Sequence, residues 1–146
     1  FYPLQSLKKD KIHVSEIPII IDAGDEQTLH ELNILARTIS DDVVEADDEK
    51  RLKLHLAAVI CNNFVNYLYR LTEEFCMAEN LDFQLFYPLI KETASRIENI
   101  SPAKSQTGPA IRKDQETIEK HITLLHKYPE LEKFYTLFTE SILNRQ

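Results

Sequence analysis

The stretch from residue 48 to residue 79 constrains the fold more than any other part of the chain. It contains neither proline nor glycine, and its apolar side chains occupy nearly every face of a helix. A helix of this kind is typical of the centre of a helical bundle or of an interface between subunits. We therefore predict one long helix over 48–79, with Asn80 suited to its end. Its apolar residues are Leu52, Leu54, Leu56, Ala57, Ala58, Val59, Ile60, Phe64, Val65, Leu68, Leu71 and Phe75.

A short β pattern precedes this helix. The apolar β-branched run Ile17-Pro18-Ile19-Ile20-Ile21 indicates a buried strand, and Val43-Val44 indicates a second. Asp25 is a suitable N-cap for a helix between them, and strand-helix-strand favours a parallel pair. Two strands are too few for a stable sheet, so we expect the edge of a sheet whose remainder is missing. The apolar face of the intervening helix would hold Leu29, Leu32, Ile34, Leu35, Ala36 and Ile39.

Three further helices are predicted after the long one. Asp82 can cap a helix over 83–99, with Pro88 in an early turn or at a kink. Residues 101–113 form an irregular segment, Asp114 caps a helix to about residue 127, and Pro129 opens the last helix, to about residue 144. The predicted fold class is mainly α (α+β), with a strand-helix-strand over 1–46 and a helical domain over 47–146. The incomplete sheet would pair with a second chain or be partly disordered over residues 1–20.

Composition limits the classes of partner. Only two glycines occur in 146 residues, which favours helix over tight hairpins and phosphate-binding loops. The formal net charge of -7, without a basic block, argues against nucleic acid, whereas a small anionic substrate needs only a local Arg or Lys. The longest apolar run is far below the roughly 20 residues that cross a bilayer, so no membrane partner is expected. Cys61 and Cys76 are expected to be buried, reduced thiols of a cytoplasmic protein.

Polar side chains interrupt the apolar long helix. At 100° per residue, His55, Asn62 and Asn66 fall within about 40° of one another, with Asn63 about 60° further. Buried polar groups need partners, which a neighbouring helix, a second subunit or a ligand can supply. One interpretation is therefore a binding site. The other is a core histidine with amides bonded to nearby backbone.

The irregular segment carries a second candidate site, from Gln106 to Asp114. It holds one of the two glycines, Gly108, directly before a proline, which indicates a fixed backbone shape. Arg112 could bind a carboxylate or phosphate through two hydrogen bonds. The alternative is a plain helix connection with Asp114 as the cap. The sequence has no GxGxxG, P-loop or GxSxG motif and no paired histidines at metal-ligand spacing, and His121 and His126 are expected at the surface.

Three segments resemble a known family. They are similar, in order and spacing, to the bacterial Rossmann-like proteins that carry the C-terminal domain DUF2520. These proteins are related in architecture to pyrroline-5-carboxylate reductase, prephenate dehydrogenase and the 6-phosphogluconate and β-hydroxyacid dehydrogenases. The resemblance covers nearly all of the chain. The segments are Tyr2-Pro3-Leu4-Gln5-Ser6, Leu54-His55-Leu56-Ala57-Ala58-Val59 with Asn63-Phe64-Val65-Asn66, and Thr107-Gly108-Pro109-Ala110-Ile111-Arg112-Lys113-Asp114.

The resemblance implies a helical domain of the 6-phosphogluconate dehydrogenase C-terminal type, preceded by a dinucleotide-binding domain. The strand-helix-strand within residues 1–46 would then be the end of the Rossmann-like sheet of that domain. NADP or NAD would be bound mainly by that missing domain, with Pro3 and Gln5 contributing from this chain. It further implies a homodimer packed around the long helix. His55 would be the catalytic residue of the cleft, and no metal is implied. The substrate-binding residues would be Asn63, Asn66, Thr107, Gly108, Arg112 and Asp114.

Two positions depart from the family pattern. Tyr2 precedes Pro3 where we expect histidine, and Val59 stands four residues before Asn63, where the β-hydroxyacid dehydrogenases have a catalytic lysine. His55 is then the remaining candidate for proton transfer on the stripe. Two hypotheses follow. The chain is the substrate-binding and dimerisation domain of an NAD(P)-dependent oxidoreductase, inactive without its cofactor domain, or it is a non-catalytic helical dimerisation module whose asparagines set the helix register.

Overall fold

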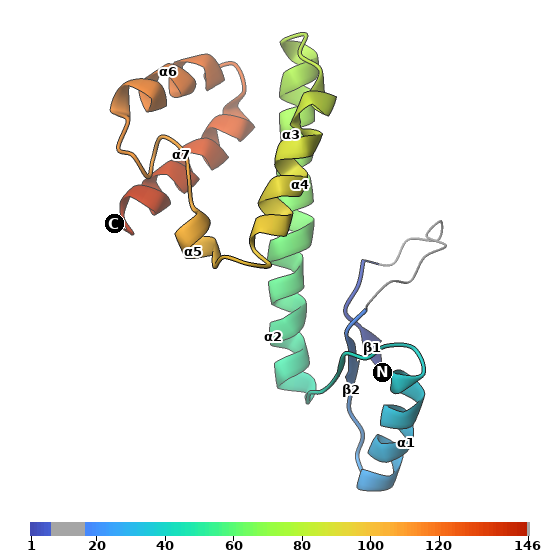
Figure 1. Cartoon of the computed structure of the whole chain (residues 1–146). Coiled ribbons are helices and arrows are strands. Elements are labelled where there is room, and N and C mark those ends of the chain that lie inside the picture. The colour runs from blue at the N-terminus through green and yellow to red at the C-terminus, as the bar shows by residue number, and fades with distance from the viewer. Residues whose placement is uncertain (7–16, 146) are drawn as a thin grey trace. The chain divides into compact units, whose positions relative to one another are not determined.

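The computed structural model describes residues 1–6 and 17–145, and it divides into two compact units, Phe1–Asn66 and Tyr67–Gln146 (Figure 1). The pairing or disorder predicted over residues 1–20 concerns in large part residues 7–16, which lie outside the described residues. The boundary predicted between residues 46 and 47 lies between β3 (Val43–Glu45) and α2 (Asp48–Ala58). That it separates two domains stays a prediction.

A three-stranded sheet forms the centre of the first unit. β1 (Tyr2–Pro3) pairs antiparallel with β2 (Ile19–Ile21), and β2 pairs in parallel with β3 (Val43–Glu45). The three isoleucines of β2 are at most 2% exposed, because β2 is the central strand and carries side chains suited to a buried pleat. The predicted buried strand and its parallel partner are confirmed. β1 adds a strand that two residues are too short to indicate in a sequence.

α1 (Glu26–Arg37) begins as predicted at the N-cap Asp25. The two carboxylate oxygens of Asp25 accept hydrogen bonds from the backbone N–H and the hydroxyl of Thr28, both at 2.8 Å. These bonds lower the pKa of Asp25, since they stabilise its charged form. The cap therefore satisfies donors at the start of the helix that otherwise lack a partner.

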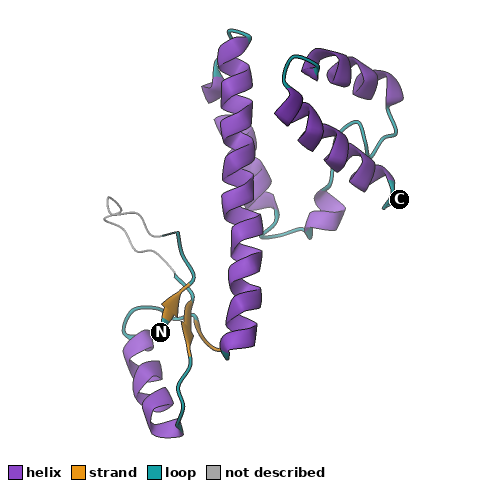
Figure 2. Ribbon diagram, turned by 180° about the vertical axis from the view of Figure 1, so that it is seen from behind, coloured by secondary structure: helices purple, strands orange, loops and turns teal. Residues whose placement is uncertain are grey.

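One side of α1 packs on the sheet. Leu29, Leu32 and Ala36 contact the cluster around Ile19 and Ile21, and Figure 2 shows the helix beside the strands. The other large apolar residues of the predicted face are not buried in the core of the first unit. More than half of each remaining side chain is exposed, because a sheet of three short strands covers only one side of the helix. These exposed residues are Ile34, Leu35 and Ile39.

The predicted long helix is helical throughout but not uniform. α2 (Asp48–Ala58) is followed by a π-helix, η1 (Val59–Phe64), and then by α3 (Val65–Ala78). No residue of α2 or η1 is buried, so the apolar residues there are not at the centre of a bundle in this chain. We call four of them, each 52–68% exposed and spaced four residues apart, the apolar row: Leu52, Leu56, Ile60 and Phe64.

α3 ends in a left-handed turn at Asn80, the residue predicted to end it. Asn80 has a φ of 56°. The N–H of Leu81 donates to the carbonyl oxygen of Cys76 at 2.8 Å, and the N–H of Asn80 donates to the carbonyl oxygen of Met77 at 3.4 Å. This pair of bonds is the Schellman arrangement, which satisfies carbonyls at a helix end and requires a positive φ. Asparagine tolerates that conformation better than most residues with a Cβ.

The rest of the second unit consists of short helices in sequence: η2 (Phe83–Phe86, a 3₁₀ turn), α4 (Tyr87–Arg96), α5 (Pro102–Ser105), α6 (Gln115–Leu125) and α7 (Pro129–Leu143). The starts predicted at Asp114 and Pro129 are confirmed. Asp82 caps η2, and α4 begins four residues later than predicted, with Pro88 in its first turn where a missing N–H costs nothing.

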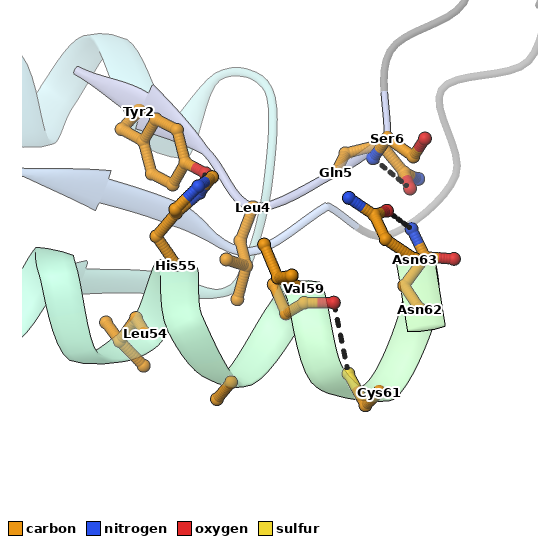
Figure 3. Close-up of a pocket in the computed structure, with 12 residues that line it drawn as sticks. Tyr2, Leu4, Gln5, Ser6, Leu54, His55, Val59, Cys61, Asn62 and Asn63 are labelled. Carbon is orange, nitrogen blue, oxygen red and sulfur yellow. Dashed lines mark hydrogen bonds between the residues drawn. The ribbon is translucent and has the colours of Figure 1, made fainter. Parts of the chain in front are cut away.

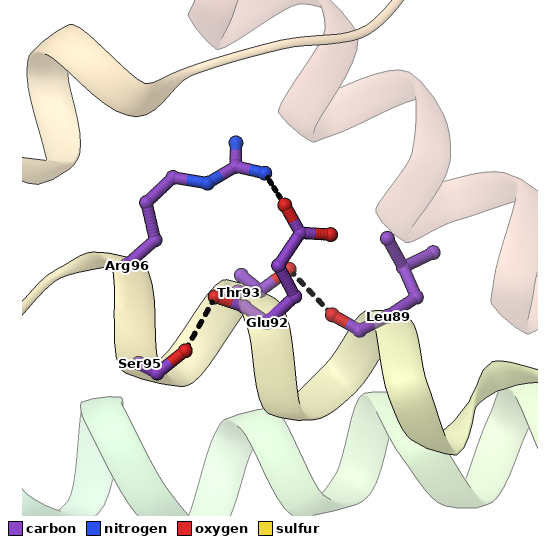
Figure 4. Close-up of polar contacts among 5 residues, drawn as sticks. All are labelled: Leu89, Glu92, Thr93, Ser95 and Arg96. Atoms are coloured by element: carbon purple, nitrogen blue, oxygen red, sulfur yellow. Dashed lines mark hydrogen bonds and ion pairs between the residues drawn. The ribbon is translucent and has the colours of Figure 1, made fainter.

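Local polar contacts stabilise α4, as Figure 4 shows. Glu92 and Arg96 form an ion pair one turn apart. The hydroxyl of Thr93 donates to the carbonyl of Leu89 at 3.0 Å, and that of Ser95 donates to the carbonyl of Glu92 at 3.2 Å. Contacts of this kind are worth only a few tenths of a kcal/mol, about 0.2–0.5, in an exposed helix. They mark a solvated face and not a site.

A polar contact joins the end of α3 to the corner between α6 and α7. The carboxylate of Glu79 accepts hydrogen bonds from the ammonium of Lys127 at 2.8 Å and from the hydroxyl of Tyr128, and the ring of Phe75 meets that of Tyr128 edge to face at 5.1 Å. The Lys127 bond, followed by the Tyr128 bond, lowers the pKa of Glu79. The same contact raises the pKa of Lys127 and that of Tyr128.

Two predictions about single side chains need correction. Cys76 is buried, and burial raises the pKa of its thiol, but Cys61 is exposed because η1 has no buried residue. His121, expected at the surface, is half-buried, and its Nδ1 lies 2.9 Å from the hydroxyl oxygen of Tyr135. His126 is exposed, as expected. Over residues 1–6 and 17–145, no helix has both the length and the apolar character needed to cross a membrane.

The turn at Asn80 predicts opposite effects for two substitutions. Asn80→Ala should lower the free energy of unfolding by about 1 kcal/mol, because alanine lacks the short polar side chain that lets asparagine tolerate positive φ. Asn80→Gly should leave it unchanged or raise it, since glycine adopts this conformation without strain. Urea unfolding of the two variants side by side measures the difference. Equal stabilities would show that the left-handed turn does not form.

The Glu79 contact predicts a loss of stability in acid. Since its folded pKa lies below the ordinary value of 4.5, its contribution is full above pH 4.5 and is lost as pH falls through the folded pKa. Glu79→Gln should therefore be less stable than the unsubstituted protein at pH 7, and the gap should narrow below about pH 4. Urea unfolding at both pH values measures this, with the exposed Glu73→Gln as the control. A gap that is constant with pH would contradict the contact.

Candidate functional site

An open hollow of about 400 Å³ in the first unit brings together two of the three segments singled out in the sequence. One wall is the chain that follows β1, and the other is the side of α2 and η1 that faces it (Figure 3). Apolar and polar side chains share the lining, which is the usual composition of a site for a small molecule. The lining residues are Tyr2, Leu4, Gln5, Ser6, Leu54, His55, Ala57, Ala58, Val59, Cys61, Asn62 and Asn63.

One end of the hollow is formed by a tyrosine and a histidine. The hydroxyl oxygen of Tyr2 lies 3.0 Å from Nδ1 of His55, and the rings meet edge to face with centroids 6.4 Å apart. Tyr2 belongs to the sheet and His55 to α2, so two regular elements hold the pair from both sides. His55 is exposed and is therefore not the core histidine of the alternative interpretation. Its side chain is open to the hollow.

Amides form the other end. Figure 3 shows Gln5 and Ser6 facing Asn62 and Asn63, with Leu4 and Val59 between this end and the Tyr2–His55 pair. The side-chain N–H of Asn62 donates to the Asn63 side-chain oxygen at 3.3 Å, and the Ser6 N–H donates to the Gln5 side-chain oxygen at 3.0 Å. Each carboxamide has further donors and acceptors for a ligand.

The π-helix decides which asparagines reach the hollow. A π-helix closes its hydrogen bonds five residues apart, so positions after Val59 no longer follow the 100° spacing of an α-helix. Asn62 and Asn63 both line the hollow, whereas Asn66, in the first turn of α3, is exposed and is not among the lining residues. Of the polar residues of the predicted stripe, His55, Asn62 and Asn63 line the hollow, and the substrate-binding role of Asn66 stays a prediction.

Tyr2 and His55 also line a second, smaller hollow of about 230 Å³. Its other residues are Asp48, Arg51 and Leu52, and the guanidinium of Arg51 lies 2.6 Å from the carboxylate of Asp48. That ion pair is largely exposed, so it contributes little to stability. The Tyr2–His55 pair therefore has a hollow on each of two sides.

The third segment lies in the second unit. Gly108 has φ 108°, which favours glycine, and the loop is closed by the Asp114 N–H donating to the carbonyl of Pro109 at 3.0 Å. The Asp114 carboxylate accepts from the N–H and the hydroxyl of Thr117 at 3.1 and 2.8 Å, which lowers its pKa. Asp114 thus caps α6, as predicted. Thr107 and Arg112 are exposed.

Sequence reasoning assigned no role to Tyr2 and left Asn62 out of the site. A signal existed for Asn62, which the helical wheel placed beside His55, but the family-like segment that gave the substrate residues holds only Asn63 and Asn66. For Tyr2 the only signal was its place in a family-like segment. Gln5 lines the hollow, whereas Pro3, paired in β1, is not among its lining residues. In the described part of the chain, no cluster of His, Cys, Asp and Glu side chains is arranged to bind a metal.

Comparison with known proteins identifies the family. The model of DUF2520, a domain of unknown function, matches residues 17–142. The chain belongs to the DUF2520 family. Among solved structures, it is similar to BF3122 from Bacteroides fragilis, a proposed NADP oxidoreductase, with 39% identity and a TM-score of 0.92 over 99% of this chain and 56% of that one. The family resemblance and the fold class expected from the sequence are therefore confirmed.

A second structure supports the same fold. Protein TM1727 from Thermotoga maritima is 27% identical, with a TM-score of 0.68 over 83% of this chain and 51% of that one. The DUF2520 chain thus spans about half the length of these two structures. No curated protein matches it.

Proposed function

We propose that this chain is the substrate-binding and dimerisation domain of an NAD(P)-dependent oxidoreductase, active together with a cofactor-binding domain. The observation that carries the proposal is the Tyr2–His55 pair, held at 3.0 Å at one end of an open hollow that has amides at the other. The likeness to BF3122, over nearly the whole of this chain, supports the reaction class and favours NADP over NAD.

The hollow suits the nicotinamide end of such a cofactor better than the phosphate end. The side-chain amide of Gln5 offers a donor and an acceptor for an uncharged polar group, whereas phosphates are usually bound by cations or helix N-termini. Among the described lining residues, none is Lys or Arg. The phosphates would therefore be held by the cofactor-binding domain.

His55 would exchange the proton of the reaction. A bound nicotinamide supplies or accepts the hydride, and the substrate oxygen or nitrogen must then gain or lose a proton. His55 is suited to this because an imidazole can both accept and donate a proton and the side chain reaches the hollow. Asn62 and Asn63 would orient the substrate. Asn66, Thr107, Gly108, Arg112 and Asp114 remain predicted substrate residues, with Arg112 the candidate for an anionic group.

The apolar row supports a homodimer. Monomeric proteins seldom expose four large apolar side chains in one line on a helix, and these four follow the spacing of a helix-packing face. A second copy packed along α2 and η1 would cover Leu52, Leu56, Ile60 and Phe64.

The alternative is a non-catalytic dimerisation module. Val59 in place of the dehydrogenase lysine and the size of the apolar row favour it. The two proposals differ in whether the full-length protein binds NADPH and needs His55.

His55→Ala in the full-length protein should leave NADPH affinity unchanged and lower turnover of NADPH with a panel of small carbonyl and imine compounds. The expected loss is about 10²–10⁴-fold, the usual contribution of a general acid–base group. NADPH binding is followed by its fluorescence and turnover by its absorbance. His30→Ala, an exposed histidine of α1, is the matched control. Equal activity of both variants would remove His55 from the reaction, and absence of NADPH binding would favour the non-catalytic module.

Leu56→Glu should convert the dimer to a monomer, because it places a charge in the middle of the apolar row. Analytical ultracentrifugation of the full-length protein measures the effect. Leu124→Glu, on a side chain of α6 exposed to a similar degree, is the control and should remain dimeric. A monomeric unsubstituted protein, or a dimer that tolerates Leu56→Glu, would contradict the proposed interface.

A further inference from the structure

We propose that Tyr2 is a positioning residue that holds a proton on Nδ1 of His55 and leaves Nε2 to act on the substrate. The inference rests on the proposed function, in which His55 exchanges a proton with the substrate. It gives a role to a residue that stands where the family pattern leads us to expect histidine.

The pair is built from regular elements. Tyr2 is paired in the sheet opposite Ile20, which is 2% exposed, so the backbone that carries the phenol is anchored in the core of the first unit. His55 follows two turns of α2. The edge-to-face contact of the rings, at an interplanar angle of 70°, restricts rotation of both side chains. The 3.0 Å separation thus has structural support on both sides.

The direction of the hydrogen bond follows from the two protonation states that proton exchange requires. An imidazolium carries protons on both nitrogens, so its Nδ1–H must donate to the Tyr2 oxygen. If the neutral imidazole also keeps its proton on Nδ1, this bond persists, and only Nε2 changes during the reaction. The opposite direction would require the Tyr2 hydroxyl to turn at every proton transfer. A bond that needs no reorganisation favours catalysis.

Few charged groups compete for this role. Asp48 and Arg51 line the smaller hollow, where they pair with one another at 2.6 Å, and Cys61 lines the larger hollow, where its thiol lies 3.7 Å from the Ala58 carbonyl oxygen. The Tyr2 hydroxyl is the group bonded to Nδ1. The arrangement is like that of other catalytic histidines, in which a partner on one ring nitrogen fixes the tautomer.

The test is the nitrogen NMR spectrum of histidine-labelled full-length protein, recorded at the alkaline end of a pH series where the His55 signals no longer change with pH. We expect the signal pattern of His55, assigned from its loss in His55→Gln, to show a protonated Nδ1 and an unprotonated Nε2. Tyr2→Phe removes only the hydroxyl and retains the ring contact, and it should move the proton to Nε2. A proton on Nε2 in the unsubstituted protein, or no change in Tyr2→Phe, would overturn the proposal.

Tyr135→Phe is the matched control. It removes a hydroxyl that lies 2.9 Å from Nδ1 of His121, in the other unit, so it should change the signals of His121 and leave those of His55 as they were. A change at His55 in this control would mean that the readout reports general loosening and not the Tyr2 contact, and the proposal would fail.

The kinetic arm separates two failures. Tyr2→Phe should lower kcat about 10- to 100-fold with little change in KM, which is the worth of one hydrogen bond to a charged group, and should change the pH profile of kcat. Unchanged kcat and pH profile in Tyr2→Phe would overturn the positioning role even where His55→Ala abolishes turnover. A fully active His55→Ala would remove the proposed function but leave the tautomer result standing.

Discussion

The first unit depends on the pairing of β2 with a strand on each side. Three β-branched residues in the central strand are covered by α1 on one face, and their backbone groups are satisfied by β1 and β3. A strand with this much apolar surface is stable only when it is paired and covered. The same pairing holds β1, and β1 carries Tyr2. The strand pairing that forms the core therefore also positions Tyr2 in the candidate site.

The two units differ in how their contacts are distributed. In the first, a few fully buried isoleucines account for most of the core, and the adjoining face of α2 is open to solvent. In the second, aromatic contacts and the Glu79 cluster connect α3 to the corner of α6 and α7, while large apolar side chains such as Met77 and Leu85 are 73% exposed. Large apolar side chains are thus exposed in both units.

Local signals in the sequence predicted the elements well. These signals act through short-range chemistry, and each was found where it was expected. Asp25 and Asp114 cap helices, Asn80 forms a left-handed turn, and Pro129 occupies the first turn of a helix. The site was harder to predict because it depends on long-range pairing and on a departure from the α-helix. Tyr2 and His55 are 53 residues apart, and no local pattern predicts the π-helix that places Asn62 and Asn63 together.

The π-helix also has a consequence for how this family can change. A single inserted or deleted residue in an ordinary α-helix rotates all following side chains by about 100° around the helix axis, so that the residues on one side of the change lose their packing contacts. A π-helix already contains such a surplus residue, so the segment from Val59 to Phe64 is a place where one residue can be lost and the helix remain continuous. The face that α2 presents to the hollow and the face that α3 presents to its own helices can therefore evolve in separate steps. The number of residues in this segment can then differ among relatives while the helix on either side of it is kept.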